Sequence, residues 1–114
     1  MGKAYKYKTL SEFYPYYLTE HQDPVSRTLH FIGTGGFIFI CIFSIVTQNW
    51  WLLLLGPLCG YGFAWVGHFF FEKNKPATFV YPAFSLASDF IMFYHILTLQ
   101  IGRKLKEARE KISR

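Results

Sequence analysis

A long stretch of this sequence contains no charged side chains. Between positions 31 and 71 there is no Asp, Glu, Lys or Arg, although such residues make up 17% of the 114-residue chain. A helix needs about 20 predominantly apolar residues to cross a bilayer. The stretch is therefore long enough for two crossings, and the sequence predicts an integral membrane protein rather than a soluble domain.

Cysteine is also scarce, and repeats and low-complexity tracts are absent. Cys41 and Cys59 both fall inside the uncharged stretch, where a thiol usually packs as a small apolar group. Neither a disulfide nor a thiolate metal site is indicated. The basic carboxyl end has no accompanying aromatic-and-basic module, so we expect no nucleic-acid partner. The length allows one domain.

The remaining pattern predicts an all-α integral membrane fold. Asp23 and Pro24 have the order of a helix cap and a first helical residue, so they start the first span. Thr9 or Ser11 caps a short helix whose tyrosines suit the water–lipid boundary. The predicted segments of the single domain 1–114 are an interfacial helix over 9–20, spans over 24–47 and 50–71 that form a hairpin, a third membrane-associated or spanning helix over 83–102, and a basic tail over 103–114.

Positive charge gathers outside the spans. The formal net charge is +5, and the amino end, the loop at 72–75 and the tail are all basic. The positive-inside rule places these three segments, and hence both termini, on the cytoplasmic side of a bacterial inner membrane or the endoplasmic reticulum. Two crossings satisfy the rule, whereas a third would carry the tail across. The crossing of the third helix therefore stays open.

One face of the second span combines small residues with ionisable ones. Gly56, Gly60, Ala64, His68 and Glu72 follow each other at steps of four, and residues so spaced share a helix face. Small residues let neighbouring helices approach closely. We therefore expect this face to be packed, and His68 and Glu72 to point into the bundle.

Depth along the helices groups three of the ionisable side chains. At about 1.5 Å per residue, His30 lies ~9 Å inside the first span, His68 ~6 Å from the end of the second, and Asp89 ~9 Å into the third helix. Two histidines and a carboxylate with open positions suit non-haem Fe(II). His21, at the head-group level, is expected to fold over the site as a further ligand. His95 is about two turns deeper, so we expect it to bridge helices by a hydrogen bond.

Glu72 and Arg27 are the candidate catalytic residues. Glu72 either binds the metal or orients His68 from behind its ring. Arg27 either contacts lipid head groups or binds a substrate carboxylate. Coordination requires neutral imidazole, so metal affinity should fall as the pH drops below ~6.5, the ordinary histidine pKa.

Two stretches that carry these residues resemble a known family. "HQDPVSRTLH" is similar to His-x4-Asn-(Arg/Lys)-x2-His of the fungal 2-hydroxy fatty acid dioxygenase family, with Ser26 in place of the Asn. "GHFFFEKNKPA" is similar to its Gly-His-x3-Glu-(Lys/Arg)-x2-Pro-Ala. The family consists of small membrane proteins with many bacterial members, and the resemblance covers residues 13–99.

This resemblance implies an Fe(II)-dependent dioxygenase that shortens a 2-hydroxy fatty acid by one carbon. The fungal members act in the endoplasmic reticulum, in breakdown of the phytosphingosine backbone. Such an enzyme would have a lipid or fatty-acid substrate and the bilayer as its partners. The alternative is a non-catalytic membrane scaffold or lipid-binding protein, in which the histidines only join helices by hydrogen bonds.

Overall fold

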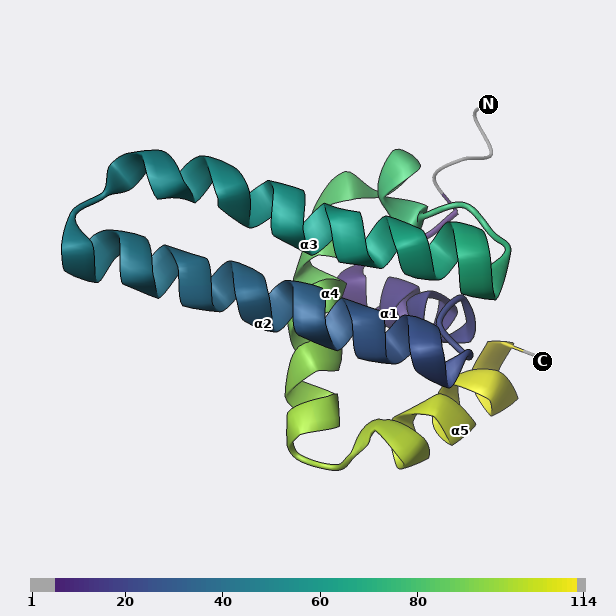
Figure 1. Ribbon diagram of the computed structural model, residues 1–114. Helices are drawn as coiled ribbons and strands as arrows, with labels where there is room; N and C mark the ends of the chain where they lie inside the picture. Colours follow the sequence, from purple (N-terminus) through teal and green to yellow (C-terminus); the bar gives the residue numbers. More distant parts are fainter. Residues whose placement is uncertain (1–5, 113–114) are drawn as a thin grey trace.

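The protein is all-helical in the computed structural model, which describes residues 6–112 (Figure 1). This confirms the all-helical part of the predicted fold class for the described part of the chain. The last two residues of the predicted tail lie outside it. The elements are α1 (Leu10–Thr19), α2 (Pro24–Thr47), the 3-10 segment η2 (Trp50–Leu54), α3 (Leu55–Val66), the π-helical segment η3 (Gly67–Glu72), the 3-10 turn η4 (Ala77–Phe79), α4 (Pro82–Leu97) and α5 (Ile101–Ile112).

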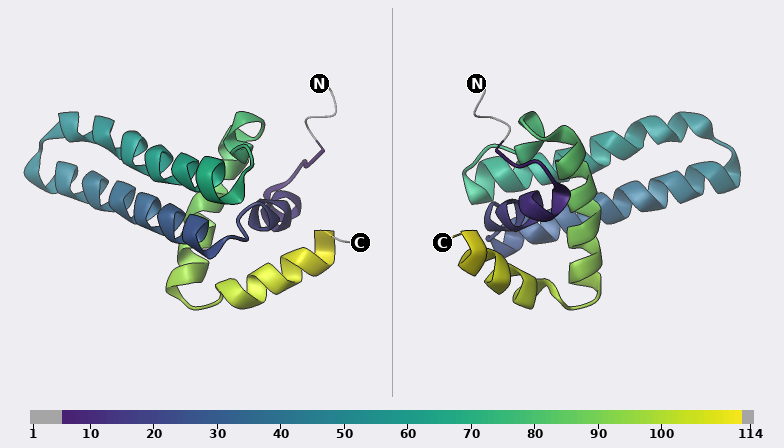
Figure 2. Two further views of the ribbon diagram at one scale, coloured as in Figure 1. Left: turned by 45° about the vertical axis from the view of Figure 1, so that its right-hand side comes forward. Right: turned by 180° about the vertical axis from the view of Figure 1, so that it is seen from behind.

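Residues 24–72 form an antiparallel helical hairpin, which we call the arm (Figures 1 and 2). Its first helix, α2, starts as expected: the Asp23 side chain accepts hydrogen bonds from the backbone N–H groups of Val25 and Ser26, and Pro24 takes the first turn. Caps of this kind stabilise a helix by ~1 kcal/mol. At the far end Gln48 ends α2 in the left-handed conformation, with φ 58°.

Glycines allow the two helical segments of the arm to pack close together. A Cβ atom on Gly33 would lie 3.0 Å from the backbone oxygen of Gly60, and one on Gly36 would lie 2.7 Å from the Sγ of Cys59. On the facing helix Gly56 and Ala64 are buried. The face of small residues predicted for the second span is thus the packed face, as expected for closely approaching membrane helices.

The helices α1, α4 and α5 form what we call the base, which surrounds the open end of the arm. α4 runs steeply across the arm in all views (Figures 1 and 2). It contacts α2 through stacked rings of Phe31 and Phe93, whose centroids are 4.7 Å apart. The core of the base consists of buried residues from these helices and η4: Phe13, Tyr17, Leu18, Ala77, Met92, Leu105 and Ala108.

Two features of the base differ from the sequence-based expectation. Tyr17 lies in the core rather than at an exposed boundary, because α1 is enclosed by α4 and α5. The helix expected over 83–102 ends at Leu97, and the expected basic tail forms α5. The break falls at Leu99, which adopts φ 63° without a glycine or proline to signal it. α5 then turns Leu105 and Ala108 into the core and its charges outward.

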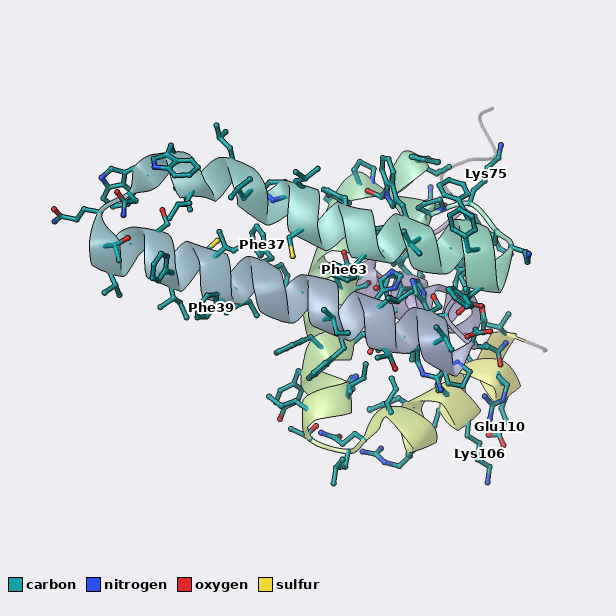
Figure 3. The ribbon with its side chains drawn as sticks, in the orientation of Figure 1. Phe37, Phe39, Phe63, Lys75, Lys106 and Glu110 are labelled. Carbon is teal, nitrogen blue, oxygen red and sulfur yellow. The ribbon has the colours of Figure 1, made fainter. Side chains whose placement is uncertain are left out.

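The arm carries two segments that are long and apolar enough to cross a membrane, Pro24–Thr47 and Trp50–Glu72. Only 22% of the most apolar part of each is buried within the protein. A core helix of a soluble protein buries far more of its apolar surface. Charged side chains lie at the opposite end of the molecule, where Figure 3 shows Lys75, Lys106 and Glu110, while Phe39 points outward from the arm.

We predict that Gly33→Val loosens the arm. The added side chain meets backbone rather than a movable group, so the unfolding free energy should fall by about 1–3 kcal/mol. Gly62→Val is the matched control, because a Cβ there has no neighbour within 4 Å among the described residues. Thermal unfolding in detergent measures both. Equal melting temperatures for the two variants would contradict the close packing.

Candidate metal centre

Three histidines from separate elements meet where the arm enters the base. His21 follows α1, His30 lies in the second turn of α2, and His68 lies in η3. Their exposed fractions are 0%, 3% and 2%. One potential ligand atom from each lies within 4.8 Å of the others, and ring centroids are 4.4 to 4.9 Å apart. The histidines expected to share one depth and face are therefore brought together.

His21 folds over the site, as the sequence predicted. It is fully buried within the protein and is stacked on the ring of Tyr17 with centroids 4.0 Å apart. Its Nδ1–H donates to the backbone oxygen of Tyr17 at 2.5 Å, and its own backbone oxygen accepts from Arg27 Nη1 at 2.9 Å. The turn between α1 and α2 is thus tied down on both sides of this imidazole.

His30 is oriented by its own helix. Its Nδ1 lies 3.0 Å from the backbone oxygen of Ser26, one turn earlier in α2. Since a carbonyl oxygen only accepts hydrogen bonds, the Nδ1 of His30 carries the proton. The Nε2 then faces the centre of the cluster.

His68 is positioned by a π-helical turn that the sequence pattern did not reveal. π turns are rare and occur frequently at functional sites. The turn ends at Lys73, with φ 60°, and returns the chain so that Asn74 Oδ1 accepts from His68 Nδ1 at 2.7 Å. Asn74 Nδ2 donates to the backbone oxygen of Glu20 at 3.1 Å and to its Oε1 at 3.3 Å. These two contacts fix which end of the amide faces the histidine.

The hydrogen bonds assign the same tautomer to all three rings. Each Nδ1 faces an oxygen that accepts, so in each neutral imidazole the Nε2 is an unprotonated lone pair. The Nε2 atoms of His21 and His30 are only 3.1 Å apart. Two lone pairs at this distance in a buried site repel each other unless a cation lies between them. The cluster is therefore built for a positively charged occupant.

The donor set fits a single metal ion. Metal–imidazole bonds of about 2.0–2.1 Å place two ligand nitrogens of one ion roughly 3 Å apart, as observed for His21 and His30. Histidine ligands whose second nitrogen donates to a carbonyl or amide oxygen are typical of metal sites. Three protein ligands leave further coordination positions open, which is the arrangement of catalytic rather than structural sites.

Asp89 lies next to the cluster rather than within it. The group of ligand atoms that meet within 4.8 Å among residues 6–112 contains the three histidines alone. Asp89 Oδ1 instead accepts a hydrogen bond from the hydroxyl of Tyr17. Burial raises the pKa of Asp89 to about 6, and burial and this carboxylate raise the pKa of Tyr17 well above its usual range. The tyrosine therefore keeps its proton, and a direct role of Asp89 as a ligand stays a prediction.

The other predicted residues contact backbone or a neighbouring helix. Glu72 does not reach His68; its Oε2 accepts from the backbone N–H of Asp23 at 2.9 Å and ties the end of the second span to the start of the first. Arg27 holds the backbone of His21. Catalytic roles for both stay predictions. His95 accepts or donates one hydrogen bond with the Tyr14 hydroxyl at 2.7 Å, which confirms its expected bridging of two helices.

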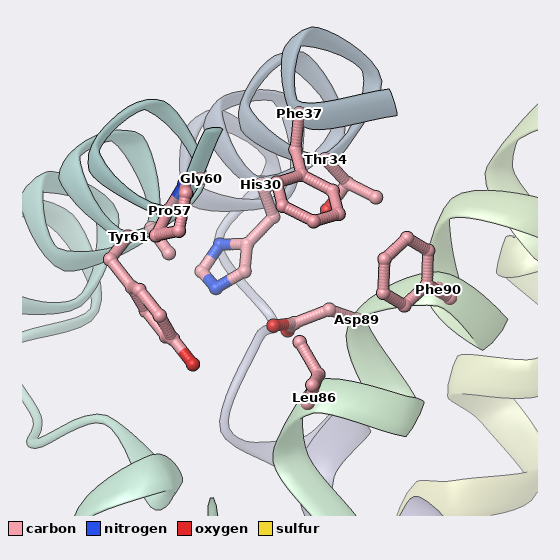
Figure 4. Close-up of a pocket in the computed structure, with 10 residues that line it drawn as sticks. His30, Thr34, Phe37, Pro57, Gly60, Tyr61, Leu86, Asp89 and Phe90 are labelled. Carbon is pink, nitrogen blue, oxygen red and sulfur yellow. The ribbon is translucent and has the colours of Figure 1, made fainter. Parts of the chain in front are cut away.

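A cavity of about 180 Å³ adjoins the cluster (Figure 4). His30, Tyr61 and Asp89 point toward its centre from three different helices. Its lining residues come from the facing sides of the arm and α4: His30, Thr34, Phe37, Pro57, Gly60, Tyr61, Ala64, Leu86, Asp89 and Phe90. The histidine cluster therefore opens onto a space with both polar and apolar walls.

Comparison with family models places most of the chain in a known family. The family model described as "2-hydroxy-palmitic acid dioxygenase Mpo1-like" matches residues 7–101. This range contains all three clustered histidines, Asn74 and the cavity lining. No curated protein and no solved structure matches the chain.

We predict that alanine substitutions distinguish residues that bind the metal from nearby residues that do not. His21→Ala, His30→Ala and His68→Ala should each abolish metal binding, because each removes a nitrogen that faces the centre. Asn74→Ala should weaken it by about 10- to 100-fold, typical for loss of a group that orients a ligand. His95→Ala is the control and should stay within a few-fold. Metal analysis after dialysis measures this series. An empty His95→Ala with a fully loaded His30→Ala would contradict the assignment.

Metal loading should persist to a lower pH than ordinary histidine chemistry suggests. Burial, followed by the two neighbouring imidazoles, holds the pKa of His21 well below 6.5. A lowered pKa keeps the ring neutral, and hence able to bind metal, at pH values where a free histidine is already protonated. Metal retention measured across a pH series should therefore be unchanged at pH 6.5 and fall only below it. Loss of metal centred above pH 6.5 would contradict this.

Proposed function

Because the chain belongs to the Mpo1-like family of 2-hydroxy-palmitic acid dioxygenases, we propose that it is an Fe(II)-dependent membrane dioxygenase that shortens a 2-hydroxy fatty acid by one carbon. The observation that carries the proposal is the convergence of three buried Nε2 lone pairs beside a part-apolar cavity. The overall reaction, R–CH(OH)–COOH + O2 giving R–COOH + CO2 + H2O, balances in atoms and electrons.

His21, His30 and His68 are the residues that would hold the iron, with Asp89 as the candidate for a fourth ligand. Bound Fe(II) would bring O2 and the hydroxy acid together and supply the redox chemistry. Imidazole ligands suit zinc, copper and nickel as well as iron. Oxygen chemistry named by the family favours iron among these.

The remaining residues of the site orient the histidines and cover the ring of His21. Tyr17 keeps its proton and holds Asp89 through a hydrogen bond, while its ring covers one face of His21. Arg27 and Glu72 fix the turn that carries His21, and we propose them as supporting catalytic residues in this way. Asn74 sets the tautomer of His68. Together they fix the orientation of the histidine rings.

We place the arm across a membrane and the base at its cytoplasmic surface, in a bacterial inner membrane or the endoplasmic reticulum. The exposed apolar surface of the arm and the charges at the opposite end support this orientation. α4 lies across the arm and has 16 residues, about 24 Å, which is short for a crossing. Two crossings then keep both termini on the basic side, in agreement with the positive-inside rule.

Activity can be tested directly on the purified protein in lipid vesicles. With Fe(II), O2 and 2-hydroxypalmitic acid, mass spectrometry should detect the fatty acid shortened by one carbon, together with consumption of O2. Unsubstituted palmitic acid is the matched control substrate and should not react. A protein that binds iron fully but forms no product from any 2-hydroxy acid would rule out the proposed reaction.

Glutamine substitution distinguishes an enzyme from a scaffold. His30→Gln and His68→Gln keep a hydrogen-bonding amide but lose the imidazole nitrogen that faces the centre. We expect both to retain near-wild-type melting temperatures without metal and to lose iron and activity. If both variants kept iron and product formation, the histidines would be helix-joining groups and the scaffold alternative would stand.

A further inference from the structure

The cavity beside the metal centre is a groove that opens sideways between α3 and α4. Its inner end is formed by His30, Thr34 and Asp89, and its outer rim includes Pro57 and Leu86. Both rim residues are exposed, Leu86 by 47%. The opening lies on the flank of the arm rather than at the charged end of the molecule. With the arm across the membrane, as proposed above, a molecule in the lipid phase reaches the groove without passing through water.

Polarity changes along this groove. The imidazole of His30 and the carboxylate of Asp89 point toward one another from α2 and α4 (Figure 4), and Tyr61 also lines the groove. Toward the rim the walls are Phe37, Phe90 and the rim residues already named. This order suits an amphiphile with its polar head at the metal centre and its apolar chain directed outward into lipid.

The groove is too small for a whole long-chain fatty acid. Its volume is about 180 Å³, and an apolar cavity of ~150 Å³ accommodates benzene. On that scale the groove holds roughly seven non-hydrogen atoms. A palmitic chain with its hydroxyl and carboxyl groups is more than twice that size, so most of it must lie outside the protein.

We propose that this groove, between α3 and α4, binds the head and first carbons of the fatty acid, which arrives sideways from the bilayer while the rest of its chain stays in lipid. The proposal rests on the function proposed above and specifies how its substrate is held. The protein then discriminates between substrates by the structure of the carbons near the carboxyl group. Chain length matters through partition into the membrane and not through contacts with the protein.

Substitution at the rim tests the proposal. Leu86→Trp narrows the opening and should lower kcat/KM for 2-hydroxypalmitic acid by about 10-fold or more, with iron content unchanged. Leu97→Trp is the matched control on the same helix: Leu97 is also exposed, by 61%, but does not line the groove. It should behave as wild type. Equal kcat/KM for the two variants would overturn the proposal.

Photolabelling tests binding without relying on turnover. 2-Hydroxy fatty acids with a diazirine close to the carboxyl end, or at the far end of the chain, are incorporated into phosphatidylcholine vesicles with the iron-loaded protein without O2. The first probe should label peptides around Pro57 or Leu86, and the second should label lipid instead. Strong labelling of the groove by the far-end probe, or none by the first, would overturn the proposal.

The two experiments separate this inference from the proposed reaction. If wild type forms no shortened acid but the first probe labels the groove, the reaction is wrong and the binding site stands. If wild type forms product, yet Leu86→Trp matches Leu97→Trp and the groove is unlabelled, the reaction stands and the lateral binding site is wrong.

Discussion

The contact on which this structure depends is the approach of two unprotonated imidazole nitrogens, 3.1 Å apart, in a buried site. Each of these nitrogens is bare because the other nitrogen of its ring donates to a fixed oxygen of the protein. Without a cation this contact is repulsive. With one it becomes a pair of coordination bonds, so metal binding and the local fold are coupled.

The architecture brings the three histidines of the cluster together from three directions. The arm supplies His30 near the start of one helix and His68 near the end of the other, and the base supplies His21 from the turn after α1. Glycines let the helices of the arm approach closely, while α4 and α5 enclose α1 and hold Tyr17 against His21. The apolar arm and the buried polar site therefore meet where the arm enters the base. In the proposed function this arrangement places oxidative chemistry beside the lipid phase.

Helix periodicity and depth were enough to predict much of this arrangement from sequence. Asp23 and Pro24 marked the start of α2, and the steps of four through Gly56 and Ala64 identified the packed face on which His68 lies. The same reasoning treated the second span as a regular α-helix throughout. It therefore could not anticipate the π turn, which carries Glu72 away from His68 and brings Asn74 to it.

The local sequence pattern also could not predict the burial of the amino-terminal segment. Tyr17 and His21 carry polar atoms, and such residues in a short helix ahead of a membrane span are normally at an interface. Their burial depends on α5, whose helical character was hidden in a basic tail, and on the break at Leu99 that has no glycine or proline to mark it. Contacts between residues distant in sequence therefore determine the burial of Tyr17 and of His21.

X-ray absorption at the iron edge tests the central claim most directly, because it reports the ligands of the metal in the intact protein. On protein purified from its own membrane, the account predicts iron surrounded by about three imidazole nitrogens at ~2.1 Å, with the outer-shell scattering that imidazole rings produce. Iron bound without imidazole scattering, or protein that takes up no iron, would contradict it.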